Sequence, residues 1–235
     1  MKKESQNQPP EEAQEKNNCR LNRPMGILTV DASGASAERD TEDAAWHELV
    51  NAYRTRKILS GDLGGIERME GGWGVAVVYY KGCRVLIPME EMMINLEGDG
   101  RENSDPLNRQ TRLVNNMLGA EVDFMVRDMD EKSQSVVASR KEAMLRKRQQ
   151  FYLPQQDAPP MIVPGRTVEA RVIAVAPKAV RLEVFGVECS LKARDMAREW
   201  MSDANEKFAT GDVVSVVVKS VTGDSISAYF LEEQA

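Results

Sequence analysis

Short segments with β-strand character occur twice in the same order along the chain. In the second half, residues 168–175, 180–185 and 213–219 alternate between an apolar face and a mostly polar one, which is typical of strands buried on one side. Residues 226–230 end that set. The first half has segments with β-strand character at 75–80, 84–87, 122–127 and 136–138. The pattern predicts a mainly β fold.

Helical spacing is present in front of the first set of strands. Trp46, Leu49, Val50 and Tyr53 follow an i, i+3, i+4, i+7 pattern after an acidic first turn. We expect an amphipathic helix over residues 41–56 that packs on the first β domain; a helix that binds a partner is the alternative. His47 lies within this pattern, which favours a packing or solvent-exposed role.

A helix is also expected between the third and fourth strands of each set. In the first set Asp105 and Pro106 provide an N-cap and a first-turn proline, and Gly119 ends the helix. In the second set residues 191–207 have helical character. The glycines between residues 61 and 74 indicate bulges and tight turns in a bent strand. Five strands with one such helix outline a small barrel, and the same order of elements occurs twice.

The two halves align as an internal repeat. Residues 119–126 match 211–218, and residues 82–87 match 186–191. We therefore expect five regions: a disordered tail at 1–40, the helix at 41–56, a first barrel with a basic C-terminal helix at 57–148, a linker at 149–163 and a second barrel at 164–235. The tail is rich in Gln, Asn, Glu, Pro, Ser and Gly, which bury little apolar surface. Residues 21–30 are an alternative docking segment within it.

The charge distribution leaves room for a nucleic-acid partner. The net charge is −6, but Lys and Arg counted against Asp and Glu give −4 for residues 1–53, +1 for 54–148 and 0 for 164–231. The acidity therefore belongs to the ends, and the predicted barrels can carry local basic faces. No apolar run is long enough for a membrane span and no secretory signal is evident, so we expect a cytoplasmic protein.

Residues for catalysis or metal binding do not form recognisable groups. Cys19, Cys83 and Cys189 are far apart, and His47 is the one histidine, which disfavours a zinc site, a disulfide framework and a histidine-dependent triad. No glycine-rich loop followed by Lys-Ser/Thr is present to hold a nucleotide. We expect a protein that is not an enzyme and needs no cofactor or metal.

The repeat resembles the S1 domain, the RNA-binding OB-fold module of bacterial ribosomal protein S1. The segments that carry the resemblance in the first copy are 73–77, 85–91, 119–126, Asp130 and 138–141. Those in the second copy are 179–182, 189–195, 211–218 and 225–229. The resemblance implies tandem β-barrels that bind single-stranded RNA on an outer face in a bacterial cell.

The resemblance also implies where ligands would lie. In the family, bases stack on exposed aromatic residues of the second and third strands, with a histidine and an arginine nearby. The first aromatic position falls on Trp73, the second on Ala76, the histidine position on Pro88 and the arginine position on Ser135. The second copy has Lys178, Arg181, Lys192 and Ser225 at these positions. Its cations are suited to phosphates more than to bases.

The candidate nucleic-acid-binding residues are therefore Trp73, Tyr80, Arg84, Arg140, Lys141, Lys178, Arg181 and Lys192. Trp73 is either a stacking surface or a plug at the barrel end. Tyr80, expected to share the outward face of its strand with Ala76 and Val78, either binds the ligand or packs on a helix. The charged candidates are either ligand contacts or solvated surface residues.

The basic residues after the first barrel allow two interpretations. They are either the solvated end of a helix or an electrostatic track between the barrels. This set consists of Arg140, Lys141, Arg146, Lys147 and Arg148.

Three functions fit these observations. The first is a non-catalytic protein that binds single-stranded RNA by stacking and phosphate contacts, as an accessory to translation or RNA metabolism. The second is a pair of degenerate barrels that bind other proteins in a ribosomal, transcription or mobile-element complex. The third is single-stranded DNA binding through the same surface. Because few aromatic positions are retained, binding should be weak, sensitive to salt and nearly independent of sequence.

Overall fold

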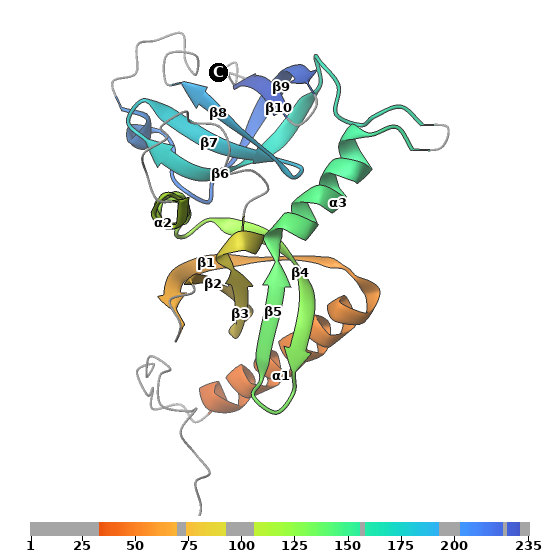
Figure 1. Cartoon of the computed structure of the whole chain (residues 1–235), viewed down its shortest axis with the longest axis vertical. Coiled ribbons are helices and arrows are strands. Elements are labelled where there is room, and N and C mark those ends of the chain that lie inside the picture. Colours follow the sequence, from red (N-terminus) through yellow and green to blue (C-terminus); the bar gives the residue numbers. More distant parts are fainter. Residues whose placement is uncertain are drawn as a thin grey trace, which may run out of the picture. The chain divides into compact units, whose positions relative to one another are not determined.

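The fold consists of two β structures with short helices. The computed structural model describes residues 33–69, 74–92, 106–155, 158–192, 203–222 and 225–230, and all of its strands lie within the unit Arg39–Ala235 (Figure 1). Three α-helices are present in the described part of the chain: α1 (Ser33–Thr55), α2 (Pro106–Asn115) and α3 (Arg140–Tyr152). The prediction of a mainly β fold is confirmed.

The first β structure is a closed barrel with the strand order β1-β2-β3-β5-β4. An OB-fold is a five-stranded Greek-key barrel, and this barrel has that form. Closure depends on the long first strand, which pairs with β2 on one side and with β4 on the other. The strands are β1 (Ile58–Arg68), β2 (Gly74–Tyr80), β3 (Cys83–Pro88), β4 (Glu121–Asp130) and β5 (Ser135–Ser139).

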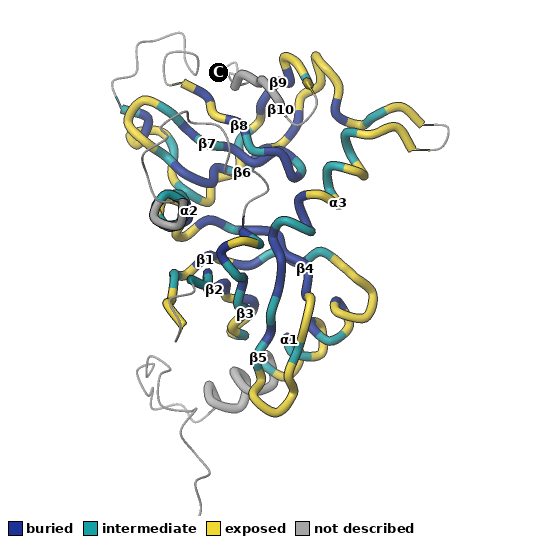
Figure 2. Tube along the Cα trace, in the orientation of Figure 1, coloured by how far each residue is buried: buried dark blue, intermediate teal, exposed yellow. Residues whose placement is uncertain are grey.

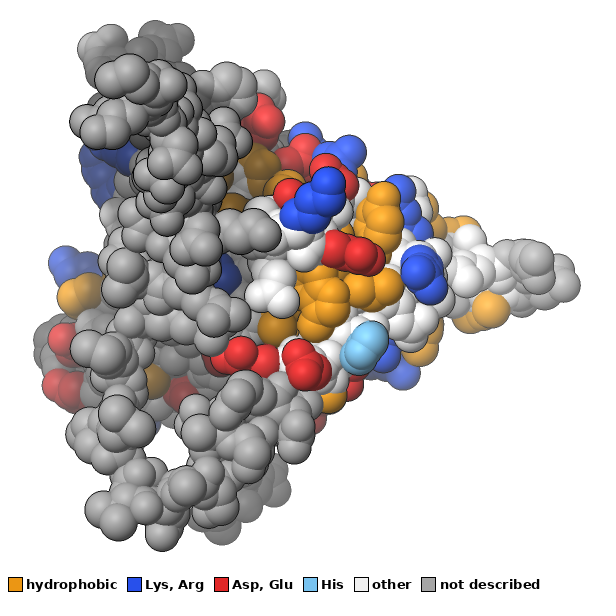
Figure 3. Space-filling view, turned by 90° about the horizontal axis from the view of Figure 1, so that it is seen from below, with side chains coloured by type: hydrophobic (Ala, Val, Ile, Leu, Met, Phe, Trp, Pro, Cys, Tyr) orange, Lys and Arg blue, Asp and Glu red, His pale blue; other side chains and the backbone are white. Residues whose placement is uncertain are grey.

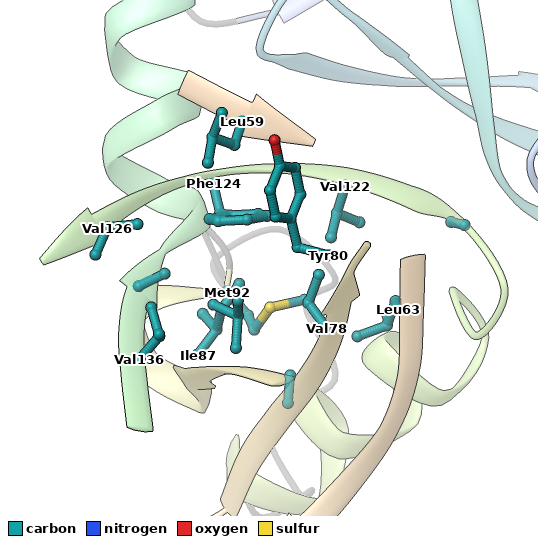
Figure 4. Packing of buried hydrophobic residues seen from close by; sticks show 14 of the residues in the cluster. Leu59, Leu63, Val78, Tyr80, Ile87, Met92, Val122, Phe124, Val126 and Val136 are labelled. Atoms are coloured by element: carbon teal, nitrogen blue, oxygen red, sulfur yellow. The ribbon is translucent and has the colours of Figure 1, made fainter. Parts of the chain in front are cut away.

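The barrel interior and helix α1 form one apolar core. Alternate residues of each strand point inward, including Val78, Ile87 and Phe124 (Figure 4). Helix α1 adds Ala45 and Leu49, which are both buried, so its apolar stripe covers the first barrel. Helix α1 begins at Ser33, so the expected disordered tail of residues 1–40 extends too far; the apolar pattern that marks the helix starts only at Trp46.

The second β structure is a five-stranded sheet with the order β10-β9-β6-β7-β8. Its strands are β6 (Thr167–Ala176), β7 (Ala179–Val184), β8 (Val187–Lys192), β9 (Val213–Thr222) and β10 (Ser225–Phe230). Strands β8 and β10 lie close together without completing the ring by hydrogen bonds. The expectation of a second closed barrel is therefore met only in part, although its five strands have the expected order.

The repeat extends to details of the backbone. Strand β1 has a bulge between Leu63 and Gly65 in its pairing with β2, and β6 has one between Val172 and Ala174 in its pairing with β7. The amide of Gly119 donates to the carbonyl of Leu63, and that of Gly211 donates in the same way to Val172. Leu63 is thus equivalent to Val172. This equivalence allows paired positions of β1, β2 and β3 to be compared with those of β6, β7 and β8.

Two expected boundaries differ from the structure. Helix α3 starts after Ser139, whose hydroxyl caps the amide of Glu142, and runs to Tyr152, so the expected linker at 149–163 begins inside a helix. In the second copy the helical region expected at 191–207 contains the end of β8 and a 3-10 turn, η3 (Ala204–Glu206); its remaining residues lie outside the described part. Helix α2 begins at Pro106, as expected.

Candidate nucleic-acid interface

A row of three residues crosses the outer surface of the first barrel. Asp62 of β1 pairs with Tyr79 of β2, and Tyr79 pairs with Arg84 of β3. All three are exposed, and Tyr79 has 48% of its surface accessible. We call these residues the Tyr79 row. The row presents an aromatic ring beside a guanidinium group.

The ring of Tyr79 lies against the backbone of Gly64. A Cβ atom at Gly64 would overlap the Tyr79 ring atoms Cδ2 and Cε2, so the ring takes the space that any other residue would fill. Gly64 is the additional residue of the β1 bulge. One side of the ring is thereby supported, and the exposed remainder can receive a planar group.

Arg84 pairs with Glu67 at the surface. The guanidinium of Arg84 donates to a carboxylate oxygen of Glu67, and the two side chains are 47% and 51% exposed. Exposed ion pairs contribute about 0–1 kcal/mol, so a phosphate can replace Glu67 at small cost. Arg84 therefore remains a candidate ligand contact.

Tyr80 lies inside the barrel, which corrects the expected orientation of β2. It is 7% exposed, its ring meets Phe124 edge to face at 6.0 Å, and its hydroxyl donates to Glu48 of α1 (Figure 4). Burial and the bond to Glu48 raise the pKa of Tyr80. Ala76 and Val78 point inward with it. Of the two roles weighed for Tyr80, the structure therefore shows packing on the helix.

Tyr79 is the residue that sequence reasoning missed. Two adjacent tyrosines leave the alternation of β2 ambiguous. The repeat contains a usable signal, because Tyr80 stands two positions before Gly82 as Val184 stands two positions before Gly186. Val184 belongs to the apolar face of its strand, so Tyr80 should have been assigned inward and Tyr79 outward.

The equivalent row of the second copy is formed by Arg171, Glu183 and Glu188. Arg171 pairs with Glu183, and Glu183 pairs with Glu188, at the positions that Asp62, Tyr79 and Arg84 occupy in the first copy. Each charge of the first row is thus reversed, and the tyrosine is replaced by a carboxylate.

Arg140 fills this second row. Its Nη2 donates to Glu183 at 2.5 Å, and its Nη1 donates to Glu188 at 2.8 Å and to the carbonyl of Met92 at 3.0 Å. Burial alone would raise the pKa of Glu188, but Arg140 and Arg181 outweigh it, so this pKa is lowered. Arg140 has no exposed surface, which contradicts both the ligand role and the solvated helix end expected for it.

Other residues of the basic run are also engaged within the protein. Lys147 pairs with the buried Asp123, and Arg146 donates to the carbonyl of Arg56. Lys141 is half-buried. The start of α3 is buried, while Leu145, Arg146, Gln149 and Gln150 further along it are exposed (Figure 2). At Arg140 and Lys147 the predicted electrostatic track is therefore wrong, because these charges join parts of the same molecule.

Asp123 is the centre of a second charged group. Lys147 and Arg171 both pair with its carboxylate, and the hydroxyl of Ser60 donates to it at 2.7 Å. Burial would raise the pKa of Asp123, but the two cations outweigh it and lower this pKa to about 2. The carboxylate is therefore charged over the whole physiological range.

The remaining candidates lie on the second sheet or outside the described residues. Lys178 and Lys192 are exposed, and the pairing of Ala179 with Lys192 brings them to the same end of the sheet. In the described part of the chain neither lysine has an acidic partner. Arg181 is half-buried and pairs with Glu188. Trp73 lies outside the described residues, so its role stays a prediction.

Charges on the face seen in Figure 3 are mixed. Among the described residues seen there, both acidic and basic side chains lie around a group of apolar ones, so this part of the face is no basic patch. Across the described ranges, no three side chains of the metal-binding kinds come together. None of the helices within those ranges is both long and apolar enough to cross a membrane.

The comparisons with known proteins give a broad picture. No family model matches the chain. Among solved structures, it is similar to a multidomain protein with nucleic acid binding domains from Streptococcus pneumoniae TIGR4, with a TM-score of 0.32 and 8% sequence identity. The similarity covers 75% of this chain and 52% of that one, so this chain spans about half of that protein's length. No functional conclusion follows from a similarity at this level.

Proposed function

We propose that the protein binds single-stranded nucleic acid, with RNA as its ligand, and catalyses no reaction. The observation that carries the proposal is the exposed Tyr79 row on an OB-like barrel. In the second copy the same row has negative charge and holds a cation of the chain itself. In the first copy the row carries Arg84 and a free ring, which is suited to an anionic ligand with planar bases.

The expected binding is modest in strength. A base stacked on an aromatic side chain contributes about 1–3 kcal/mol. Each phosphate contact on a single strand adds about −0.7 to the slope of log K against log salt. Arg84 with one or two further cations would therefore give a slope of about −1.4 to −2.1. Stacking accepts any base, so little sequence preference is expected.

The preference for RNA rests on the S1-like order of the segments. We place the protein among cytoplasmic accessory proteins of translation or RNA metabolism on the same ground. Single-stranded DNA offers the same bases and phosphates and is the alternative ligand. A 2′-hydroxyl contact is what separates the two.

Fluorescence anisotropy with labelled oligonucleotides tests the proposal. We expect single-stranded RNA to bind in the micromolar range at low salt and Tyr79→Ala to weaken it about 5- to 150-fold, the equivalent of 1–3 kcal/mol. Tyr53→Ala is the matched control, because Tyr53 is an exposed tyrosine of α1, outside the row. Equal losses in both variants, or no salt-dependent binding by the wild type, would refute the proposal.

The second candidate function is binding of another protein. Its support is the second row, which already holds a protein side chain, Arg140, in place of a nucleic acid. By the same chemistry, the Tyr79 row would accept a carboxylate-bearing segment. Absence of oligonucleotide binding, together with a folded wild-type protein, would favour this candidate.

A further inference from the structure

We propose that the outer row of the second sheet is a docking surface for helix α3 of the same chain, so that the protein engages a polynucleotide through one barrel face only. The docking part stands on the contacts below. The single-face part rests on the proposed function.

The first step is the equivalence of the two rows. Both rows lie at the same register positions next to the same bulge, so they would present the same surface in two independent OB-like modules. They differ in charge: Tyr79 and Arg84 in the first copy correspond to Glu183 and Glu188 in the second. Two carboxylates repel phosphates and attract a guanidinium.

The second step is the occupancy of the second row. Glu183 is 4% exposed and Arg140 is inaccessible, so neither can reach a ligand in solution. Arg140 also donates to the carbonyl of Met92, which follows β3 and the 3-10 turn η1 (Met89–Glu91) of the first barrel. One side chain of α3 therefore ties Met92, just after η1, to strands β7 and β8.

The third step is the apolar contact around this charged group. Phe185, in the turn between β7 and β8, packs on Phe151 of α3 with ring centroids 4.5 Å apart. The hydroxyl of Tyr152 donates to the carbonyl of Val184 at 2.6 Å. A Cβ atom at Gly186 would overlap the carbonyl of Met144. The hairpin turn thus fits against the helix with no space for a larger residue.

The fourth step is a contact from the bulge of β6. Ile173 has no exposed surface and belongs to the apolar core of the first barrel. Its equivalent in the first copy is Gly64, which Tyr79 covers. At the same bulge position, Gly64 of the first copy therefore supports the Tyr79 ring, and Ile173 of the second copy packs into the core of the first barrel.

The consequence is a short footprint. A single OB fold covers about 4–16 nucleotides, and two open faces would extend this length. With the second row closed, affinity should stop rising once an oligonucleotide fills the first barrel. Longer strands should then bind additional protein molecules instead of binding one molecule more tightly.

Two matched variants test the docking surface on the full chain. Glu183→Gln with Glu188→Gln removes the charges of the second row, and Glu67→Gln removes the partner of Arg84 in the first. We expect the double variant to lower the denaturation midpoint and to leave oligonucleotide affinity within about twofold. We expect Glu67→Gln to raise affinity severalfold, because it frees Arg84, and to leave the midpoint unchanged.

The outcomes separate the docking claim from the proposed function. If the double variant raises affinity as Glu67→Gln does, the second row is an open ligand face and the inference is wrong. An unchanged midpoint in the double variant also overturns it. If the double variant does not fold, Tyr152→Phe replaces it, and hydrogen exchange must then show faster exchange in both α3 and β8. Equal protection in the wild type and Tyr152→Phe would count against docking.

The footprint is measured with labelled oligouridylates of 5, 10, 15, 20 and 30 nucleotides. We expect a plateau by about 16 nucleotides, apart from the small gain from additional binding registers. A tenfold rise between 15 and 30 nucleotides at one protein per strand would overturn the single-face claim. If no oligonucleotide binds, the proposed function fails, and the docking claim is decided by the midpoint and exchange measurements.

Discussion

Replacement of Arg140 by methionine should cost a large part of the protein's stability. Methionine keeps an unbranched apolar stem but leaves Glu183 without the guanidinium that faces it, and leaves Glu188 with Arg181 as its cationic partner. Breaking a buried ion pair by removing one partner costs about 3–5 kcal/mol. The whole free energy of unfolding of a domain is about 5–15 kcal/mol, so a loss of this size is at least about a fifth of the total.

Chemical denaturation followed by circular dichroism measures this loss. The variant to compare is Arg140→Met combined with Glu183→Gln and Glu188→Gln. Neutral amides of similar size remove the cost of burying unpaired carboxylates when the cation is absent. We expect the triple variant to recover at least half of the loss. Arg84→Met is the control at the exposed pair with Glu67, where about 1 kcal/mol or less is expected.

Two results would refute this reasoning. If Arg140→Met lowers the free energy of unfolding by less than about 1 kcal/mol, the guanidinium of Arg140 is solvated and does not lie between the two β structures. A triple variant no more stable than the single variant would mean that unpaired carboxylates are not the source of the loss.

Three further predictions follow from other contacts. Gly64→Ala should displace the Tyr79 ring and weaken oligonucleotide binding as strongly as loss of the ring, with about 1 kcal/mol or less lost in denaturation. Asp123 has a pKa lowered to about 2, so a stabilisation of about 2 kcal/mol should be present above pH 4 and lost as the pH falls toward 2. Acid titration of unfolding should show this loss in the wild type and not in Asp123→Asn. Lys178→Ala with Lys192→Ala should leave the salt slope of binding unchanged if the ligand stays on the first barrel, and a slope reduced by about 1.4 would contradict this.

Much of the fold could be predicted from local patterns. Period-two alternation located β4, β6, β7 and β9, and Pro106 marked the start of α2, because each of these signals depends on residues close in sequence. The repeated glycines Gly119 and Gly211 aligned the copies, and the hydrogen bonds of these two residues confirm the alignment. The predicted orientation of side chains in β2 was wrong, because Tyr79 and Tyr80 are equally suited to a barrel interior or surface.

The candidate site was harder to predict than the strands. Arg140 and Lys147 stand in a basic run that is typical of a solvated helix end. Their partners Glu183, Glu188 and Asp123 lie 24 to 48 positions away in the chain. No local pattern records such a pairing. Whether a cation faces solvent or a carboxylate is determined by tertiary packing, of α3 on β4 for Lys147 and of α3 on β7 and β8 for Arg140.

The sequence alone determined the element types, their order and the duplication, since backbone propensity and apolar periodicity act over a few neighbouring residues. The tertiary structure decided which of the two equivalent rows is open. Both rows have the same backbone, but one meets a buried guanidinium from α3 and the other meets solvent. Burial makes an unpaired charge costly, so the contact partner of each row settles what it can bind.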